Sequence, residues 1–415
     1  MSGIRVNEWL HNSGTGGIWQ TSAGNVGIAS SVPTAKLVVT GDANVSGALT
    51  ATSFNGGQLG NRNLIINGAM NVAQRGSSST TADYGTVDRI KLSYSGHDEA
   101  LTQTQHALTS SDTGPWEEGF RYSFHLQNGN QTSGAGAADQ AIFETRLEAQ
   151  DMATCGWNYT SAASNITLSF WVKSSVSQTF YGVLETQDGT GQNYPYSFDA
   201  SSTWTKITKT IPGNSNIQFD MNSNNGIQIE FHPFMGTNFT DNSVSLNTWA
   251  AAASGTRHPD MTSTWWTTDD STFEITGLQL EVGSHATPFE HRSYGDDLKR
   301  CYRYYRRLTA SSNYEFVTMG DVDNDGTNLW MLIQFNDIPF RANIASIETT
   351  GTAGDYAVRR DTTKTCTAVP AINTNPTAWN CGMTWYSASH GWATGDSAKA
   401  YIKSSGAYIG FVCEL

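Results

Sequence analysis

The sequence has 415 residues, which is enough for about two to four domains with sizeable cores. Charged residues make up only 15% and the net charge is −13, which argues against a nucleic-acid partner because such binding depends on basic patches. Aromatic residues make up 11%, which excludes a disordered chain and favours a rigid all-β protein. No apolar run approaches the roughly 18 residues of a membrane span, and Met1–Arg5 lacks the apolar character of a signal peptide. We therefore expect synthesis in a cytoplasm, solubility there, and no membrane insertion.

Residues 1–60 are rich in Gly, Ser, Thr and Ala and contain apolar runs of only a few residues. Such runs cannot bury themselves within one chain, so Leu37, Val39 and Val45 would need partner chains to cover them, as in an intertwined β-stalk. The alternative is a flexible linker, which the same composition also fits. The sequence thus predicts an N-terminal attachment or stalk segment over residues 1–60.

Residues 61–293 carry a series of short segments in which apolar and polar residues alternate, separated by turn signals such as Pro212-Gly213. This alternation is typical of half-buried antiparallel strands, and seven or more of them without helices predict a β-sandwich or jelly roll. The segments are 90–94, 120–126, 166–173, 180–185, 204–211, 227–231 and 273–280. Residues 236–270, which include Trp249, Trp265 and Trp266, are predicted to form a long polar loop.

A helix is predicted from Tyr294 to Arg307, within a linking segment over residues 294–309. A capping box, Ser293-x-x-Asp296, opens it, acidic residues lie in its first turn and arginines near its end, as the helix dipole favours. Residues 310–415 return to strand patterns and predict a second, smaller sandwich. The predicted fold class is therefore all-β: an N-terminal β-stalk followed by two antiparallel, jelly-roll-like β-sandwiches joined by one short helix.

Asp321, Asp323 and Asp325 match the first half of a D-x-D-x-D-G calcium loop. The twelfth position is Leu332 instead of a bidentate Glu, and Asn-Asp-Gly is also a strong hairpin signal. A hairpin is the favoured interpretation, and a bound Ca²⁺ is the alternative. No other cofactor is indicated.

Exposed Trp and Tyr side chains bind carbohydrate because their flat faces stack on sugar rings. The sequence offers two groups of candidates, one in the predicted loop and one in a Ser/Gly-rich C-terminal segment. They are Trp265, Trp266, Trp379, Trp385, Tyr386, His390 and Trp392. Each one alone is better explained as a core residue, whereas the cluster at 379–392 favours an exposed platform.

The run Arg300–Arg307 could bind anionic sugars through arginine and tyrosine. At helical spacing, however, Leu298, Cys301, Tyr305 and Leu308 form an apolar stripe, which favours a structural role in packing one sandwich on the next. For catalysis we find no GxSxG, HExxH or phosphate-binding loop, so no catalytic residue is assigned and an enzyme is not predicted. The five cysteines lack metal-like spacing and are expected to be free buried thiols, with Cys366 and Cys381 as the one pair that could join.

Several motifs occur in an order that resembles bacteriophage tail-fibre proteins, over about residues 20–57 and 61–310. They include GNVGI (24–28), NLIINGAMNVAQRG (63–76), YGTVDR (84–89), SFWVKSS (169–175) and LQLEVGSHATPFEHRSYGDDLKRCYRYY (278–305). The resemblance implies a homotrimeric virion protein, assembled in the cytoplasm of a bacterial host and located in the tail. Residues 1–60 would dock to a tail adaptor, nozzle or baseplate protein, and the C-terminal sandwich would contact a host surface polysaccharide or lipopolysaccharide.

Three hypotheses about function follow from this sequence. The first is a trimeric tail fibre that binds a host surface glycan for adsorption. The second is a purely structural virion protein, either a head decoration or a tail connector, without a receptor of its own. The third is a depolymerase that cleaves the glycan.

Overall fold

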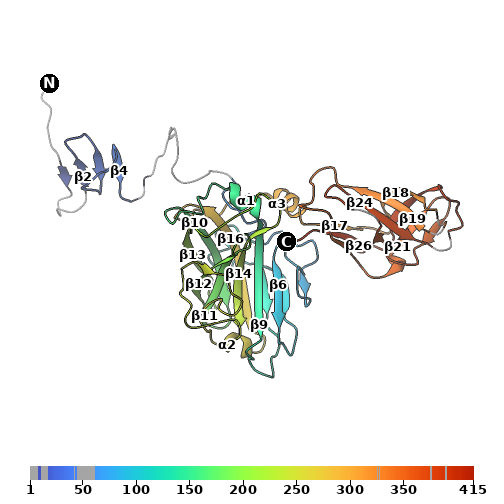
Figure 1. Cartoon of the computed structure of the whole chain (residues 1–415), viewed down its shortest axis with the longest axis horizontal. Helices are drawn as coiled ribbons and strands as arrows, with labels where there is room; N and C mark the ends of the chain where they lie inside the picture. The colour runs from blue at the N-terminus through green and yellow to red at the C-terminus, as the bar shows by residue number, and fades with distance from the viewer. Residues whose placement is uncertain are drawn as a thin grey trace. The chain divides into compact units, whose positions relative to one another are not determined.

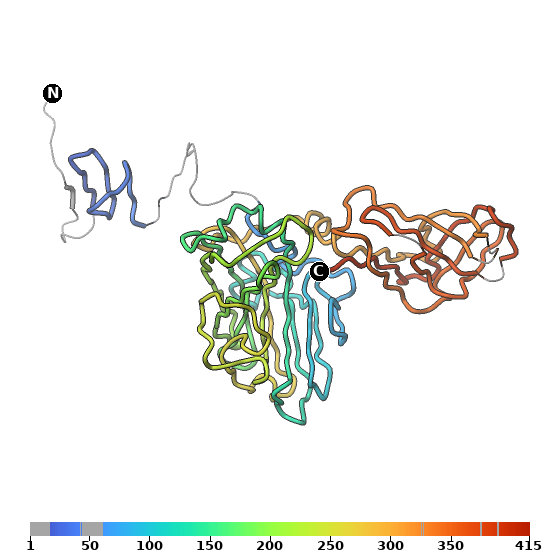
Figure 2. Tube along the Cα trace, in the orientation of Figure 1, coloured from blue at the N-terminus to red at the C-terminus, as the bar shows by residue number. Residues whose placement is uncertain are grey.

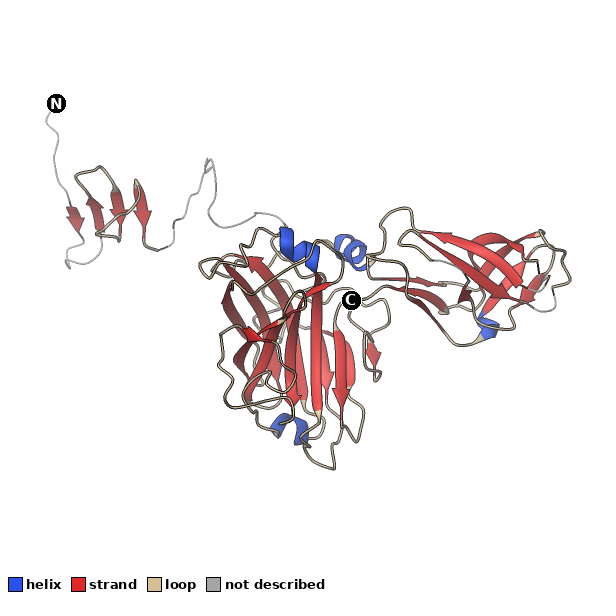
Figure 3. Ribbon diagram, in the orientation of Figure 1, coloured by secondary structure: helices blue, strands red, loops and turns tan. Residues whose placement is uncertain are grey.

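The structure is a computed structural model that describes residues 8–10, 17–41, 43, 61–324, 326, 328–373, 376–387 and 390–415. It is almost entirely β (Figure 3), which confirms the predicted fold class. The chain separates into two compact units, residues 1–55 and 56–415. In the described residues no helix is long and apolar enough to cross a membrane.

The first unit contains one small sheet in the order β1-β2-β3-β4. Its strands are Glu8–Leu10, Gly17–Gln20, Val26–Ile28 and Leu37–Val39, and β3 and β4 run parallel. Four apolar side chains of this unit are exposed: Ile18, Ile28, Val32 and Leu37. The exposure of Leu37 agrees with the prediction that this residue needs a partner chain to cover it. Val45 lies outside the described residues.

The second unit begins with a sandwich of two six-stranded antiparallel sheets (Figure 1). One sheet has the order β13-β10-β16-β8-β7-β5: Thr205–Pro212, Asn165–Ser174, Thr272–Val282, Tyr122–Gln127, Thr102–Ala107 and Ser78–Ser79. The other has the order β15-β12-β11-β14-β9-β6: Ala250–Ala251, Gln192–Ala200, Gln178–Thr186, Asn225–Met235, Gln140–Glu148 and Lys91–Ser95. Strand alternation points one face of each sheet inward, where stacked and edge-on rings such as Phe143 and Phe231 fill the core.

Two short helices accompany this sandwich, α1 (Ala149–Thr154) and α2 (Thr264–Thr267). A third helix, α3 (Tyr294–Cys301), leads to the second sandwich, as the change from yellow to orange in Figure 2 traces. The backbone N–H of Asp296 donates to Oγ of Ser293 at 3.2 Å, so the predicted N-terminal cap is confirmed.

The predicted end of this helix was wrong. The chain leaves the helix after Cys301, and Tyr305–Thr309 forms strand β17, which pairs with residues 408–412. The helical spacing of Tyr305 and Leu308 therefore does not form a stripe on one helix.

The second sandwich packs a three-stranded sheet on a seven-stranded one. The small sheet has the order β17-β26-β20, with β26 at Tyr408–Val412 and β20 at Ser346–Thr349. The large sheet has the order β22-β21-β25-β18-β19-β24-β23: Thr363–Thr365, Tyr356–Arg359, Ser397–Ile402, Glu315–Val322, Asn328–Gln334, Asn380–Tyr386 and Ala371–Ile372. A short 3₁₀ turn, η1 (Ala353–Asp355), precedes β21.

Ion pairs join the two sandwiches. The guanidinium of Arg303 donates to both oxygens of Glu148 at 2.5 and 2.7 Å, and Tyr304 donates to the same carboxylate at 2.8 Å. Arg75 reaches Glu348 and Glu414, each at 3.1 Å. The arginine run therefore has the structural role that the sequence favoured, as part of the contact between the sandwiches.

Candidate functional site

The structure places the candidate residues of the predicted loop in the core. Trp265 and Trp266 are fully buried, and their indole N–H groups donate to the carbonyls of Thr272 and Gly134, both at 3.1 Å. Trp249 is also buried, and its indole donates to the carbonyl of Pro212. The interpretation of Trp265 and Trp266 as carbohydrate-binding residues was therefore wrong, because no ring face reaches solvent.

The C-terminal cluster divides in the same way. Trp385 is fully buried beside Tyr356, with the ring centroids 5.8 Å apart. His390 and Trp392 are buried and stack on each other at 5.1 Å.

These three residues, Trp385, His390 and Trp392, pack the sandwich instead of forming a platform. Trp379, with 52% of its surface exposed, and the half-buried Tyr386 are the candidates that reach solvent. Residues 388 and 389 of the same segment lie outside the described residues.

The acidic segment forms the predicted hairpin. Val322 in β18 pairs with Leu329 in β19, and the backbone N–H of Asp323 donates to the carbonyl of Asn328 at 2.8 Å. Oδ1 of Asp321 accepts a hydrogen bond from Ser397 at 2.6 Å. Asp325 lies outside the described residues, so Ca²⁺ binding by Asp321, Asp323 and Asp325 stays a prediction.

A second group of apolar side chains, which the sequence analysis did not single out, lies on the outer face of the seven-stranded sheet. Phe316, Met319 and Trp330 come from β18 and β19, and 52%, 54% and 43% of their surfaces are exposed. Phe316 pairs with Tyr401 of β25, and their rings lie 6.0 Å apart. We call Phe316, Met319, Trp330 and Tyr401 the aromatic platform.

Polar groups surround the aromatic platform. In the strand register Asp321 stands opposite Trp330 of β19 on one side and Ser397 of β25 on the other, and Lys399 stands opposite Met319. Hydroxyl, carboxylate and ammonium groups at the edge of a flat aromatic surface can hydrogen-bond a molecule that lies on it. Large exposed apolar side chains that adjoin in this way mark interaction sites in soluble proteins.

The sequence contained a signal for this platform. In β19 the alternate residues Leu329, Met331 and Ile333 face the core, yet Trp330 and Leu332 between them are also apolar. A half-buried strand normally places polar residues on its outer face. An apolar residue at every position of such a strand indicates that both faces make contacts.

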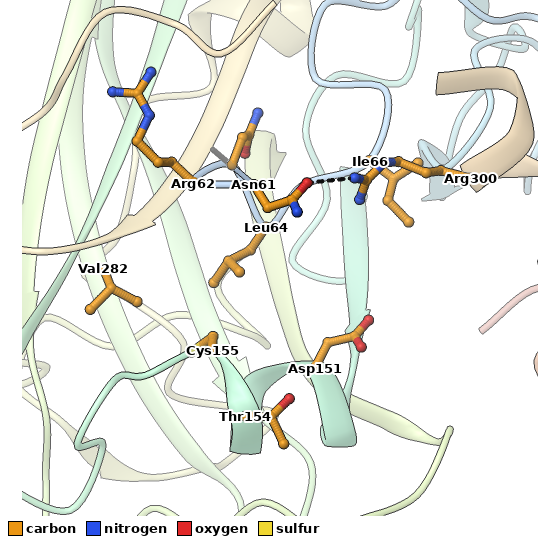
Figure 4. Close-up of a pocket in the computed structure, with 10 residues that line it drawn as sticks. Asn61, Arg62, Leu64, Ile66, Asp151, Thr154, Cys155, Val282 and Arg300 are labelled. Carbon is orange, nitrogen blue, oxygen red and sulfur yellow. Dashed lines mark hydrogen bonds between the residues drawn. The ribbon is translucent and has the colours of Figure 1, made fainter. Parts of the chain in front are cut away.

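A pocket of about 400 Å³ lies between α1 and residues 61–66 (Figure 4). Asn61 accepts a hydrogen bond from Arg300 across it at 2.8 Å, and Asp151 and Cys155 lie on α1 and just after it. Burial raises the pKa of the Cys155 thiol, which keeps it protonated and a poor nucleophile. Cys155 therefore gives this pocket no activated nucleophile.

Comparison with known proteins gives no family assignment. No family model matches the chain, and no curated protein matches it either.

Among solved structures, the chain is similar to the enzymatically active domain of tailspike protein 4 from bacteriophage CBA120, with 13% identity and a TM-score of 0.29. That match covers 53% of this chain and 21% of the tailspike chain. The N-terminal cellulose-binding domain of Cellulomonas fimi β-1,4-glucanase C matches with 11% identity and a TM-score of 0.25, over 52% of this chain and 99% of that one. A sugar-binding protein described for Bacteroides thetaiotaomicron matches with 10% identity and a TM-score of 0.27, over 54% and 100%. These identities and TM-scores are too low to carry a conclusion about function.

Proposed function

We propose that this protein is a bacteriophage tail fibre that adsorbs to a host through a surface glycan, and that the aromatic platform of the second sandwich is its contact surface. The order of the tail-fibre-like motifs supports the virion assignment. The exposure of Phe316, Met319 and Trp330 on one sheet face is the observation that carries the proposal.

The chemistry of the platform favours a sugar over a protein of opposite charge. Trp330 offers a flat ring, and neighbouring positions supply the hydroxyl of Ser397, the carboxylate of Asp321 and the ammonium group of Lys399. A polysaccharide needs both features, because its rings have apolar faces and hydroxyl edges.

The first unit supports the proposal of a homotrimer attached through residues 1–60. Ile18, Ile28 and Leu37 of its sheet are exposed, as is Val32 between β3 and β4, and such small apolar strands are stable only when something covers them. Two further copies of the same segment would supply that cover.

Adsorption of the phage in the presence of purified protein tests the proposal. We expect the wild-type protein to compete with phage for host cells and to bind the isolated surface polysaccharide in calorimetry. Trp330→Ala is expected to weaken this binding at least about tenfold, since central aromatic contacts each contribute about 2 kcal/mol. Met221→Ser changes an exposed apolar side chain on the first sandwich and serves as the matched control.

The same samples separate the alternatives. A purely structural virion protein would not compete and would not bind the polysaccharide. A depolymerase would release reducing sugar from it. If Trp330→Ala changes the molar mass in solution and leaves glycan binding intact, the platform is a contact between copies instead.

A further inference from the structure

Glu274 lies on the outer face of the first sandwich, away from every residue of the aromatic platform. It is buried, with 4% of its side chain exposed, in strand β16. Strand register places His125 of β8 directly opposite it, and His106 of the next strand, β7, lies opposite Ser123. Three neighbouring strands therefore bring two imidazoles and one carboxylate to a single point.

The ligand atoms of these three side chains converge. Nδ1 of His106 lies 2.9 Å from Oε2 of Glu274, and Nδ1 of His125 lies 3.5 Å from Oε1. All three ligand atoms lie within 4.8 Å of one another. Tetrahedral zinc with bonds of about 2.0–2.1 Å separates its ligands by roughly 3.3 Å, so only small side-chain shifts would complete a site.

One nitrogen of this set lacks a well-formed hydrogen bond. Nδ1 of His125 is buried, and apart from its 3.5 Å contact with Oε1 of Glu274 it has no hydrogen-bond partner, which is costly for an imidazole nitrogen. A metal ion held by Nδ1 of His106, Nδ1 of His125 and Glu274 would satisfy it.

The surrounding residues fit the second shell of a metal site. Nζ of Lys173 lies 3.0 Å from Oε1 of Glu274 and 3.2 Å from Asp112, and Ser123 donates to Oε2 at 2.9 Å. These contacts fix the orientation of the carboxylate, as groups behind metal ligands do. Lys173 occupies the side of the carboxylate at Oε1. A metal ion would therefore enter from the side of His106, whose side chain is 44% exposed.

We propose that His106, His125 and Glu274 bind one divalent transition-metal ion, with Zn²⁺ as the best fit. Two imidazoles and one carboxylate suit zinc better than the all-oxygen sets that calcium prefers. Three protein ligands leave one coordination position for water on the open side. The ion would link strands β7, β8 and β16 through one side chain from each.

Calorimetric titration of the full chain with ZnCl₂ in a buffer that does not bind metal tests the site. We expect one Zn²⁺ per chain and a rise in melting temperature on binding. His106→Gln and His125→Gln should each weaken Zn²⁺ binding by at least about tenfold. Removing a group that only supports a metal ligand already costs about that much, and these variants remove a ligand itself. His285→Gln, an exposed histidine elsewhere on the same sandwich, should bind as the wild type does.

A spectroscopic readout keeps the test independent of folding effects. Co²⁺ added to the wild-type protein should give the visible absorption of a low-symmetry nitrogen and oxygen site. His106→Gln, which replaces a half-exposed side chain, should lose this absorption while keeping its near-ultraviolet circular dichroism. The proposal is overturned if wild-type protein binds no Zn²⁺. It is equally overturned if both histidine variants bind Zn²⁺ as tightly as the wild type, since the ion would then lie elsewhere.

Discussion

Arg89 and Glu414 form an ion pair of 2.6 Å between buried side chains that are 325 residues apart in the chain. Arg89 also stacks on the ring of Tyr304 at 3.6 Å, and Glu414 accepts a second guanidinium, that of Arg75. The pair therefore joins the first sandwich to the residues that follow β26, the last strand of the second sandwich, through desolvated charges. Removing one partner of such a pair leaves the other charge buried without compensation.

Glu414→Gln is therefore expected to lower the free energy of unfolding by about 3–5 kcal/mol, measured by urea denaturation. Arg360→Gln is the matched control, because it breaks an exposed pair with Asp396 of 2.5 Å. Exposed pairs contribute less than about 1 kcal/mol. Equal losses in the two variants would contradict a special role for the buried pair.

Asp88 should make stability depend on pH in the opposite direction from most carboxylates. Burial raises its pKa to about 6, although Gln74 donates two hydrogen bonds that favour the charged form. Between about pH 4 and 6 the unfolded chain has released this proton and the folded chain still holds it. Asp88 therefore contributes about 3 kcal/mol to the free energy of unfolding below about pH 4. This contribution is lost as the pH rises from about 4 to 6.

Urea denaturation of wild type and Asp88→Asn from pH 4 to 7 measures this contribution. The difference in stability between them should change with pH across the window and become constant above about pH 6. Asp269→Asn controls for the loss of one exposed negative charge. A pH-independent difference for Asp88→Asn would show that the carboxyl titrates normally.

Trp385 and Trp379 should differ in how much stability their truncation costs. Trp385→Ala leaves a cavity at a fully buried site and should lower the free energy of unfolding by about 3–5 kcal/mol. Trp379→Ala removes a half-exposed side chain and should lower it by less than about 1 kcal/mol. Thermal unfolding followed by circular dichroism separates the two. Similar shifts in melting temperature would contradict the burial described for this segment.

The five cysteines are free, as predicted, and four of them are buried. Burial raises the pKa of each thiol, so none is activated. In native protein a thiol reagent such as dithionitrobenzoate should label Cys155 first and slowly, and the remaining thiols should react only after denaturation. Cys155→Ser should abolish the native reaction, and fast labelling that persists in this variant would place an accessible thiol elsewhere.

The alternation of apolar residues was sufficient to predict the fold class. The segment 166–173, for example, became the core of β10, because a period of two reports directly which face of a strand is buried. The start of α3 was predictable for a similar reason, since the Ser293 cap is a local interaction.

What sequence could not predict depends on distant partners. The end of α3 was missed because Tyr305–Thr309 is drawn into a sheet by β26, about a hundred residues later. Trp265 and Trp266 were misplaced because their Ser/Thr-rich surroundings say nothing about the core that receives them. His106 and His125 are 19 positions apart and lie 168 and 149 positions before Glu274, so only strand order brings them together.

The position of β26 in the small sheet sets an order of folding. β17 and β20 both pair with β26 and not with each other, so neither has a partner until residues 408–412 have been synthesised. All strands of the first sandwich, in contrast, lie before residue 283 and can pair while the ribosome is still translating the rest. A chain that stops short of residue 408 would present two unpaired strand edges, and would aggregate instead of yielding a shortened but soluble protein.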